Sequence, residues 1–289
     1  MLPKVLYSWK DIILTALAPA IWGSTYIVTS ELLPADRPFT SALIRVLPAG
    51  FLLLLFNPFI PIKKDLWRLF VLGTLNIGIF QALLFIAAYH LPGGLAAVIS
   101  AIQPLLVVVL VWVMNGRSPL FSTLCAAIAG ICGMAILLLS PQTVIEPIGV
   151  IAALMGAVSM ACGIWLTSQW KLNLPLLAMT GWQLVIGGII LAPIAYFFDE
   201  PLPPLEPLQY ASYIYLSLAG ALLAYTLWFR GLERLPTVAV ASLGLLSPLT
   251  AVVLGWCLLS QSISGTALLG LIIVLISVFT VQWTTLKNK

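Results

Sequence analysis

The sequence predicts an all-α polytopic membrane protein with ten transmembrane helices, arranged as two inverted five-helix repeats with both termini cytoplasmic. Hydrophobic residues make up 62% of the 289-residue chain and charged residues 8%, a balance that is not typical of soluble domains. Ten apolar stretches have about the 20 residues that a helix needs to cross a bilayer. Segments 91–112 and 235–256 also align without a gap, which indicates an internal repeat.

The ten predicted spans follow one another with short connections. They cover residues 11–33, 39–57, 66–90, 93–115, 120–140, 147–168, 175–198, 208–231, 235–259 and 264–284. The first span is predicted to be a retained helix rather than a signal peptide, because no cleavage site follows it. We divide the chain into a first five-helix repeat (1–140), an outer linker (141–146) and a second, inverted five-helix repeat (147–289).

Lysine and arginine positions determine the predicted orientation. With the N-terminus in the cytoplasm, eleven of these residues fall on the inner side and one, Arg37, on the outer side. The inner residues are Lys4, Lys10, Lys63, Lys64, Arg68, Arg117, Lys171, Arg230, Arg234, Lys287 and Lys289. Cytoplasmic loops carry this excess of positive charge, so both termini are predicted to be cytoplasmic. Five spans per half is an odd number, and the second repeat therefore crosses the membrane in the opposite sense.

The internal repeat is clearest in the fourth and ninth spans. Both matching segments start with Leu-Pro, and Pro104 corresponds to Pro248, 144 residues later. The earlier spans align at an offset of 138, which pairs Arg45 with Gln183. Inverted repeats of this kind occur in secondary transporters, where the substrate site lies between the halves near the membrane midplane.

These features resemble the ten-helix drug/metabolite transporter superfamily, in its EamA-type bacterial branch. The residues that carry the resemblance are Ala20-Ile-Trp-Gly-Ser-Thr-Tyr26, Arg45, Leu91-Pro92, Pro104, Leu235-Pro236 and Pro248. Within that branch the chain is most similar to the YddG-type aromatic amino-acid exporters. The resemblance implies a multi-pass protein of the bacterial inner membrane that exports small molecules.

Pro104 and Pro248 are predicted to form hinges or kinks beside a substrate cavity. They remove one backbone hydrogen bond each, to the carbonyls of Ser100 and Gly244, and the freed carbonyls could face the cavity. Paired interruptions at corresponding positions are the best sequence indication of a binding site in such proteins. Gln103 and Ser247, beside the prolines, are therefore predicted to line the cavity. The alternative is a static kink that only helps the helices to pack.

Arg45 is the one charged residue that lies well inside a predicted span, about two helical turns below the outer end. A charge at that depth costs at least about 3 kcal/mol unless it is paired or hydrated. One interpretation is an anchor for a substrate carboxylate, which arginine can bind through two parallel hydrogen bonds. The other is a structural arginine that is bonded to backbone carbonyls and to Glu31.

Aromatic and amide side chains form the third group of candidates. Amides are unfavourable toward lipid and are expected to point inward. Aromatic walls with a few amides suit an aromatic or amphipathic solute, including a cation held over ring faces. For any single aromatic residue, packing in the core or at the lipid interface is the alternative. The predicted cavity residues of this group are Trp22, Tyr26, Asn76, Gln81, Trp165, Gln183, Tyr225 and Trp228.

The residues that are missing from the spans restrict the possible chemistry. All nine acidic residues lie in loops or at span ends, and the chain has a single histidine. The four cysteines lie in apolar segments without metal-binding spacing, and the sequence has no Walker A motif. Acid–base catalysis, metal binding and ATP-driven transport therefore lack their residues. No enzyme activity, cofactor or metal is expected.

The predicted function is the export of small amphipathic metabolites, above all aromatic and neutral amino acids, by a secondary transporter. Alternating access would use a central cavity between the repeats. A passive channel or facilitator, a lipid-linked-sugar flippase and a drug efflux protein of the same superfamily are the alternatives. The expected partners are a small-molecule substrate and the lipid bilayer, with the protein as a monomer. No nucleic acid is expected, because the net charge of +4 comes from scattered residues.

Overall fold

The computed structural model describes residues 9–34, 36–90, 99–116, 118–138, 146–258 and 265–287. Within these ranges all regular secondary structure is helical, without a strand. Seven segments are long and apolar enough to cross a membrane, and three shorter apolar helices fall on the remaining predicted spans. The predicted all-α polytopic membrane fold is confirmed.

The helices of the first half follow the predicted spans closely. They are α1 (Trp9–Leu32), α2 (Pro38–Phe56), α3 (Lys63–Gly73), the π turn η1 (Thr74–Ile79), α4 (Phe80–His90), α6 (Gln103–Asn115) and α7 (Phe121–Leu138). Together α3, η1 and α4 form the third predicted span. The Leu91-Pro92 pair, at the start of the fourth predicted span, lies outside the described residues.

The helices of the second half also match their predicted spans. They are α8 (Pro147–Gln169), α9 (Leu176–Phe198), α10 (Pro207–Ser217), the π turn η2 (Leu218–Leu223), α11 (Ala224–Arg234), α12 (Thr237–Leu243), α13 (Leu246–Leu258) and α14 (Gly265–Lys287). Proline is the first residue of α2, α8 and α10. It is favoured there because its missing N–H group would have no partner inside the helix.

The third and eighth spans each contain a π turn, and the two turns lie at matching positions. η1 begins at Thr74 and η2 at Leu218, which differ by the offset of 144 that aligns these parts of the two halves. A π turn has a wider hydrogen-bonding register than an α-helix and often lies at a functional site. It therefore changes which side chains of α4 and α11 face the centre of the molecule.

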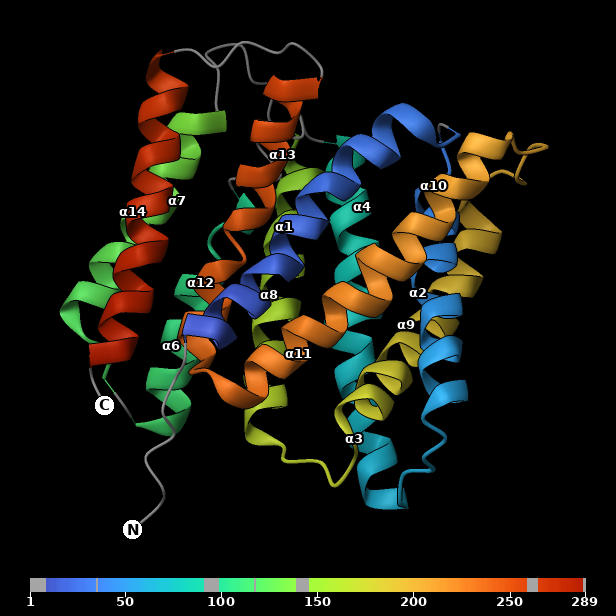
Figure 1. The fold of residues 1–289 in the computed structure, drawn as a ribbon, viewed down its shortest axis with the longest axis horizontal. Coiled ribbons are helices and arrows are strands. Elements are labelled where there is room, and N and C mark those ends of the chain that lie inside the picture. The colour runs from blue at the N-terminus through green and yellow to red at the C-terminus, as the bar shows by residue number, and fades with distance from the viewer. Residues whose placement is uncertain are drawn as a thin grey trace.

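The two predicted repeats interlock and do not form separate bodies (Figure 1). α2 packs along α9 and α7 packs along α14, while α1 lies against α11 and α13. Glycines allow this close approach: a Cβ atom on Gly50 would lie 2.8 Å from the backbone nitrogen of Val185. One on Gly133 would lie 3.0 Å from the carbonyl oxygen of Gly270. Helices from both halves therefore surround the centre of the molecule.

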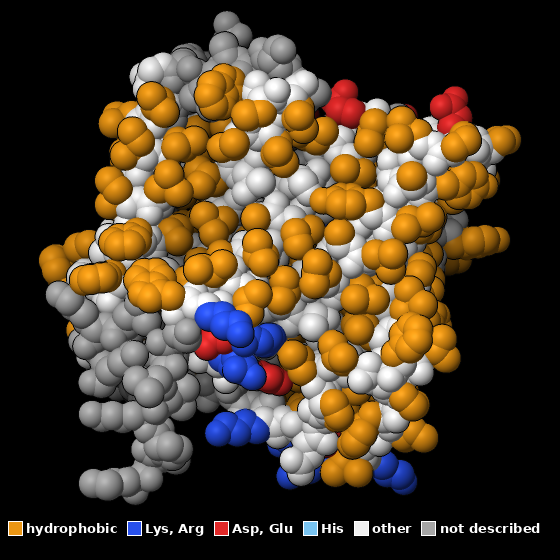
Figure 2. Space-filling model, viewed as in Figure 1, with side chains coloured by type: hydrophobic (Ala, Val, Ile, Leu, Met, Phe, Trp, Pro, Cys, Tyr) orange, Lys and Arg blue, Asp and Glu red, His pale blue; other side chains and the backbone are white. Residues whose placement is uncertain are grey.

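The surface in Figure 2 is mostly apolar. Large apolar side chains such as Leu55, Phe121 and Phe198 are more than 70% exposed, as expected for helices that face lipid hydrocarbon. In this view lysine and arginine side chains gather in the lower part, and acidic side chains also lie at the upper edge. This distribution supports the orientation with the lysine- and arginine-rich side in the cytoplasm, which stays a prediction.

Candidate functional site

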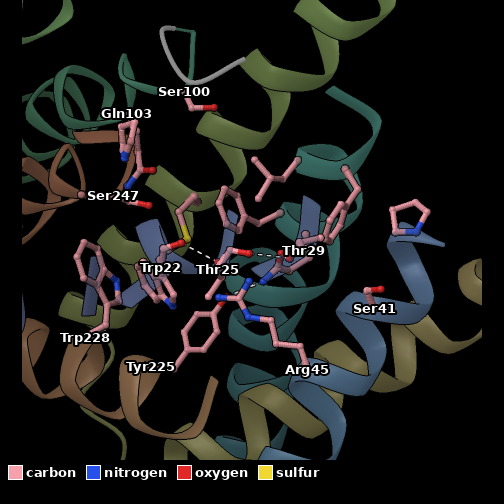
Figure 3. A pocket seen from close by; sticks show the side chains of 18 of the residues that line it. Trp22, Thr25, Thr29, Ser41, Arg45, Ser100, Gln103, Tyr225, Trp228 and Ser247 are labelled. Atoms are coloured by element: carbon pink, nitrogen blue, oxygen red, sulfur yellow. Dashed lines mark hydrogen bonds between the residues drawn. The ribbon is translucent and has the colours of Figure 1, made fainter. Parts of the chain in front are cut away.

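A cavity of about 510 Å³ lies between helices of the two halves (Figure 3). It extends from the loop between α1 and α2, at residues 36–38, to the side chains of Trp22 and Trp228. Its volume is in the range of small-molecule binding sites. The polar wall residues are Thr25, Thr29, Asp36, Arg37, Ser41, Arg45, Gln81, Ser100, Gln103 and Ser247. The aromatic wall residues are Trp22, Phe80, Phe85, Tyr225 and Trp228.

Most of the residues predicted from sequence line this cavity. They are Trp22, Arg45, Gln81, Gln103, Pro104, Tyr225, Trp228, Ser247 and Pro248. Tyr26 lies within α1, and its side chain is outside the described part of the structure. The sequence reasoning missed the wall residues Thr25, Ser41 and Met160. Thr25 lies three residues after Trp22 and Ser41 four before Arg45, so helical periodicity around the chosen residues would have indicated both.

The floor of the cavity is a closely packed group of aromatic rings. The ring of Trp22 lies 5.0 Å from that of Tyr225 and 5.3 Å from that of Trp228, measured between centroids, with tilted planes. Such tilted contacts are favourable beyond the apolar area that they bury. Tyr225 and Trp228 are each 1% exposed. The floor therefore closes the cavity at the end away from the α1–α2 loop.

Arg45 lies in the cavity wall and is held by the π turn η2. Its Nη2 atom donates a hydrogen bond to the carbonyl oxygen of Gly220 at 3.0 Å, and Trp22 Nε1 donates to the same oxygen at 3.0 Å. A Cβ atom at residue 220 would lie 3.1 Å from Thr25 Cγ2 and 3.5 Å from Arg45 Nε. Glycine therefore leaves room for the guanidinium group, which points toward Tyr225 and Thr25 in Figure 3.

The wall residues Gln81 and Trp228 each have a polar atom with no hydrogen-bond partner among the described residues. Gln81 Nε2 donates to the Tyr225 hydroxyl at 3.0 Å, but Gln81 Oε1 and Trp228 Nε1 are buried and unpaired. Buried polar groups are rarely left unpaired in folded proteins. One acceptor and one donor beside the inner end of the cavity thus lack a partner, and a solute would reach them only after the wall moves to expose them.

The prolines of the fourth and ninth spans follow breaks in the helices. A turn at Ala101 and Ile102 precedes α6, and a turn at Gly244 and Leu245 separates α12 from α13. The expectation that the Gly244 carbonyl would be left without a backbone partner is wrong. It accepts a hydrogen bond from Ser247 N at 3.1 Å, because the chain there forms a tighter turn with bonds to the third residue.

Asn76 and Gln183, both predicted to line the cavity, bind each other outside its wall. Asn76 Nδ2 donates to Gln183 Oε1 at 2.8 Å and to Thr167 Oγ1 at 3.1 Å. Both amides are fully buried. Asn76 belongs to η1 and packs against Gly163 of α8, where a Cβ atom would overlap its side-chain oxygen. The amides point inward as expected, but they join η1 to α8 and α9.

Trp165 also lies outside the cavity wall. Its Nε1 atom donates to Asn115 Oδ1 at 3.0 Å. Asn115 lines a second hollow of about 360 Å³ that includes Ser168 and residues 232–238. Trp165 is therefore associated with the opposite end of the molecule from the α1–α2 loop.

An ion pair joins α1 and α11 on the far side of the aromatic floor. Arg230 Nη2 donates to Asp11 Oδ1 at 2.7 Å, and Arg234 Nη1 lies 3.9 Å from the same oxygen. Thr15, one turn after Asp11, packs against Gly231, the residue next to Arg230, so closely that a Cβ atom on Gly231 would overlap it. These contacts hold the two helices together where the second hollow begins. The cavity wall thus reaches the α1–α2 loop at one end, and α1 and α11 are held together at the other.

Comparisons with known proteins agree with this architecture. The chain matches the EamA-like transporter family over residues 9–139 and 147–283. It is 44% identical to Protein PecM of Dickeya dadantii over 94% of this chain and 92% of that protein. It is 28% identical to the uncharacterized transporter YvbV of Bacillus subtilis over 99% of this chain and 96% of that protein. It is 26% identical to the uncharacterized inner membrane transporter YedA of Escherichia coli K12 over 89% of this chain and 86% of that protein. A crystal structure with 16% sequence identity superposes with a TM-score of 0.81 over 97% of this chain and 99% of that one. The chain is a multi-pass membrane protein of the EamA-like transporter family, within the drug/metabolite transporter superfamily.

Proposed function

We propose that the protein exports small amphipathic metabolites, above all aromatic and neutral amino acids, across the bacterial inner membrane by alternating access. The observation that carries this proposal is a cavity whose wall runs from the α1–α2 loop to a floor of the packed rings of Trp22, Tyr225 and Trp228. A carrier needs a site that faces one side at a time, whereas a channel needs a continuous path. The closed floor therefore favours a carrier over a passive channel, and the absence of catalytic groups in the sequence favours transport over an enzyme.

The wall offers separate partners to the parts of an aromatic amino acid. Its ring would lie against Phe80, Phe85 and Trp22, which line the same space. Its carboxylate would lie beside Arg45, because arginine binds carboxylates through directed charge-assisted hydrogen bonds. Its ammonium group would take the unpaired Gln81 Oε1 as acceptor.

Contacts at matching positions support the proposal of two inverted repeats. Arg45 of the first half binds Gly220 in η2, and its counterpart Gln183 binds Asn76 in η1. Gly220 and Asn76 are themselves 144 residues apart, as are Gln81 and Tyr225, which bind each other. Under this proposal, the inward-facing state would form when the two halves exchange their open and closed arrangements. The movement would take place at the breaks before Pro104 and Pro248 and at the π turns.

We expect purified protein in liposomes to release labelled tryptophan and phenylalanine faster than protein-free liposomes. The release should saturate with the internal amino-acid concentration, because a solute-binding site limits the rate. A matched preparation that carries Arg45→Gln should release both amino acids more slowly at low concentration. If the amino acids leave no faster than from protein-free liposomes, aromatic amino acids are rejected as substrates.

Replacing Asp11 with asparagine is expected to raise the population of the inward-facing state. The change removes the charge that pairs with Arg230 at 2.7 Å and weakens the closed end. The measurement uses a protein whose four native cysteines are replaced and that carries Ser247→Cys in the cavity wall. A membrane-impermeant thiol reagent is added from either side of the membrane, and the rate of cysteine labelling is followed. In the Asp11→Asn protein, the cysteine introduced by Ser247→Cys should react several-fold faster with reagent added from the cytoplasmic side.

Glu200→Gln is the matched control for that measurement. It breaks the Arg37–Glu200 ion pair of 3.0 Å at the open end and should leave labelling from the cytoplasmic face at the level of the protein with Asp11 and Glu200 intact. Equal labelling in the Asp11→Asn protein and its parent would show that the ion pair does not hold this end closed.

A further inference from the structure

We propose that the cavity selects its solute by charge: it accepts anionic, zwitterionic and neutral planar aromatic solutes and rejects organic cations of the same shape. This inference rests on the proposed transport function, because it names the class of solute that the same cavity takes. It also separates this protein from exporters of cationic drugs.

The charges around the cavity are unevenly placed. Among the described wall residues, Asp36, Arg37 and Arg45 are charged. Asp36 and Arg37 lie at the mouth with opposite signs, and Arg37 pairs with Glu200, whose side chain is 77% exposed. Water and salt screen charges at such an exposed position. Arg45 lies deeper, on the carbonyl of Gly220 and next to the aromatic floor, so the inner part of the cavity carries a positive charge.

The size of this effect follows from the position of Arg45. Two unit charges about 7 Å apart at an effective dielectric constant of about 20 change a binding constant by roughly 10- to 100-fold. The hydrogen bond from Arg45 Nη2 to the Gly220 carbonyl oxygen positions the guanidinium group but does not cancel its charge. No described carboxylate lines the inner part of the cavity to do so. An anion should therefore bind more tightly than a neutral solute of the same shape, and a cation more weakly.

Attraction between a cation and ring faces is the competing effect. It requires an accessible ring face within about 6 Å of the cation. Here the rings of the floor cover one another, since Trp22 packs on both Tyr225 and Trp228 at 5.0 and 5.3 Å. Tyr225 and Trp228 are each only 1% exposed. The repulsion from Arg45 is therefore the larger effect for a cation at this end.

Three compounds that share an indole ring test the inference. Indole-3-acetate is an anion at pH 7, indole-3-acetamide is neutral and tryptamine is a cation. Thermal-shift titration of the purified full chain reports binding without transport, because a ligand that binds the folded state raises the melting temperature by mass action. We expect indole-3-acetate to stabilise the protein at concentrations at least about tenfold lower than tryptamine, with indole-3-acetamide between them.

Variants of the wall test whether Arg45 causes this order. Arg45→Lys keeps the charge and should keep the order, whereas Arg45→Gln should bring the three half-effective concentrations within about threefold of one another. Thr29→Asp leaves Arg45 in place and adds a carboxylate to the same wall. Thr29→Asp should lower the half-effective concentration of tryptamine relative to that of indole-3-acetate. This variant also tests the effect of charge if Arg45→Gln fails to fold.

The outcomes distinguish this inference from the proposed function. Saturable tryptophan transport together with equal binding of tryptamine and indole-3-acetate overturns the charge selectivity alone. An unchanged order in both Arg45→Gln and Thr29→Asp also overturns it, since the charge of Arg45 would then not be the cause. Binding of none of the three compounds overturns the charge selectivity, and a lack of tryptophan transport as well rejects the proposed function.

Discussion

Replacing Gly163 with alanine is expected to destabilise the protein by about 1–3 kcal/mol, the usual cost of forcing extra atoms into a packed core. The Cβ atom of an alanine at this position would overlap Asn76 Oδ1. Asn76 has little room to move away, because its amide nitrogen is bonded to Gln183 at 2.8 Å and to Thr167 at 3.1 Å. The change would therefore disturb the polar contact that joins η1 to α8 and α9.

Gly156→Ala is the matched control, because it makes the same chemical change in the same helix. A Cβ atom there would lie 3.5 Å from Leu83 Cβ, an ordinary contact, and alanine favours the helix over glycine. Thermal unfolding of both proteins in detergent, followed by tryptophan fluorescence, should show a lower midpoint for Gly163→Ala only. Equal midpoints for the two variants would contradict the packing described around Asn76.

Arg45→Gln is expected to weaken tryptophan binding about 10- to 100-fold, because a hydrogen bond to a charged group contributes about 1.5–3 kcal/mol. The matched control is Gln183→Ala, at the corresponding position of the second half. Gln183 lies outside the cavity and is bonded to Asn76, so its loss should lower the unfolding midpoint but change tryptophan affinity less than about threefold.

Tryptophan affinity in these proteins can be measured by isothermal titration calorimetry in detergent. An affinity of Arg45→Gln equal to that of the unchanged protein would mean that Arg45 does not contact the solute. A weaker affinity in Gln183→Ala than in Arg45→Gln would place the binding site near the Asn76–Gln183 pair and not in the cavity.

The spans and much of the cavity wall could be predicted from sequence because the bilayer restricts both strongly. Long apolar stretches can only be helices there. Arg45 had to find polar partners, and the carbonyl of Gly220 is one of them. Pro104 and Pro248 indicated breaks in their helices, and the structure has turns directly before both.

The contacts that depend on the π turns could not be predicted in this way. η1 and η2 lie inside uninterrupted apolar stretches, and hydrophobic periodicity is weak evidence where nearly every residue is apolar. Asn76 was expected at the cavity wall but lies within η1 and donates a hydrogen bond to Gln183. The ion pair of Asp11 with Arg230 joins residues 219 positions apart, and no local pattern in the sequence connects them.

The most direct test of the central proposal is a counterflow measurement on the same proteoliposomes. Vesicles loaded with unlabelled tryptophan are diluted into a trace of labelled tryptophan, and the internal label is followed with time. A carrier that opens to one side at a time should accumulate the label transiently above its equilibrium level. A simple rise to equilibrium at a rate that does not saturate with tryptophan would contradict alternating access and indicate a passive channel.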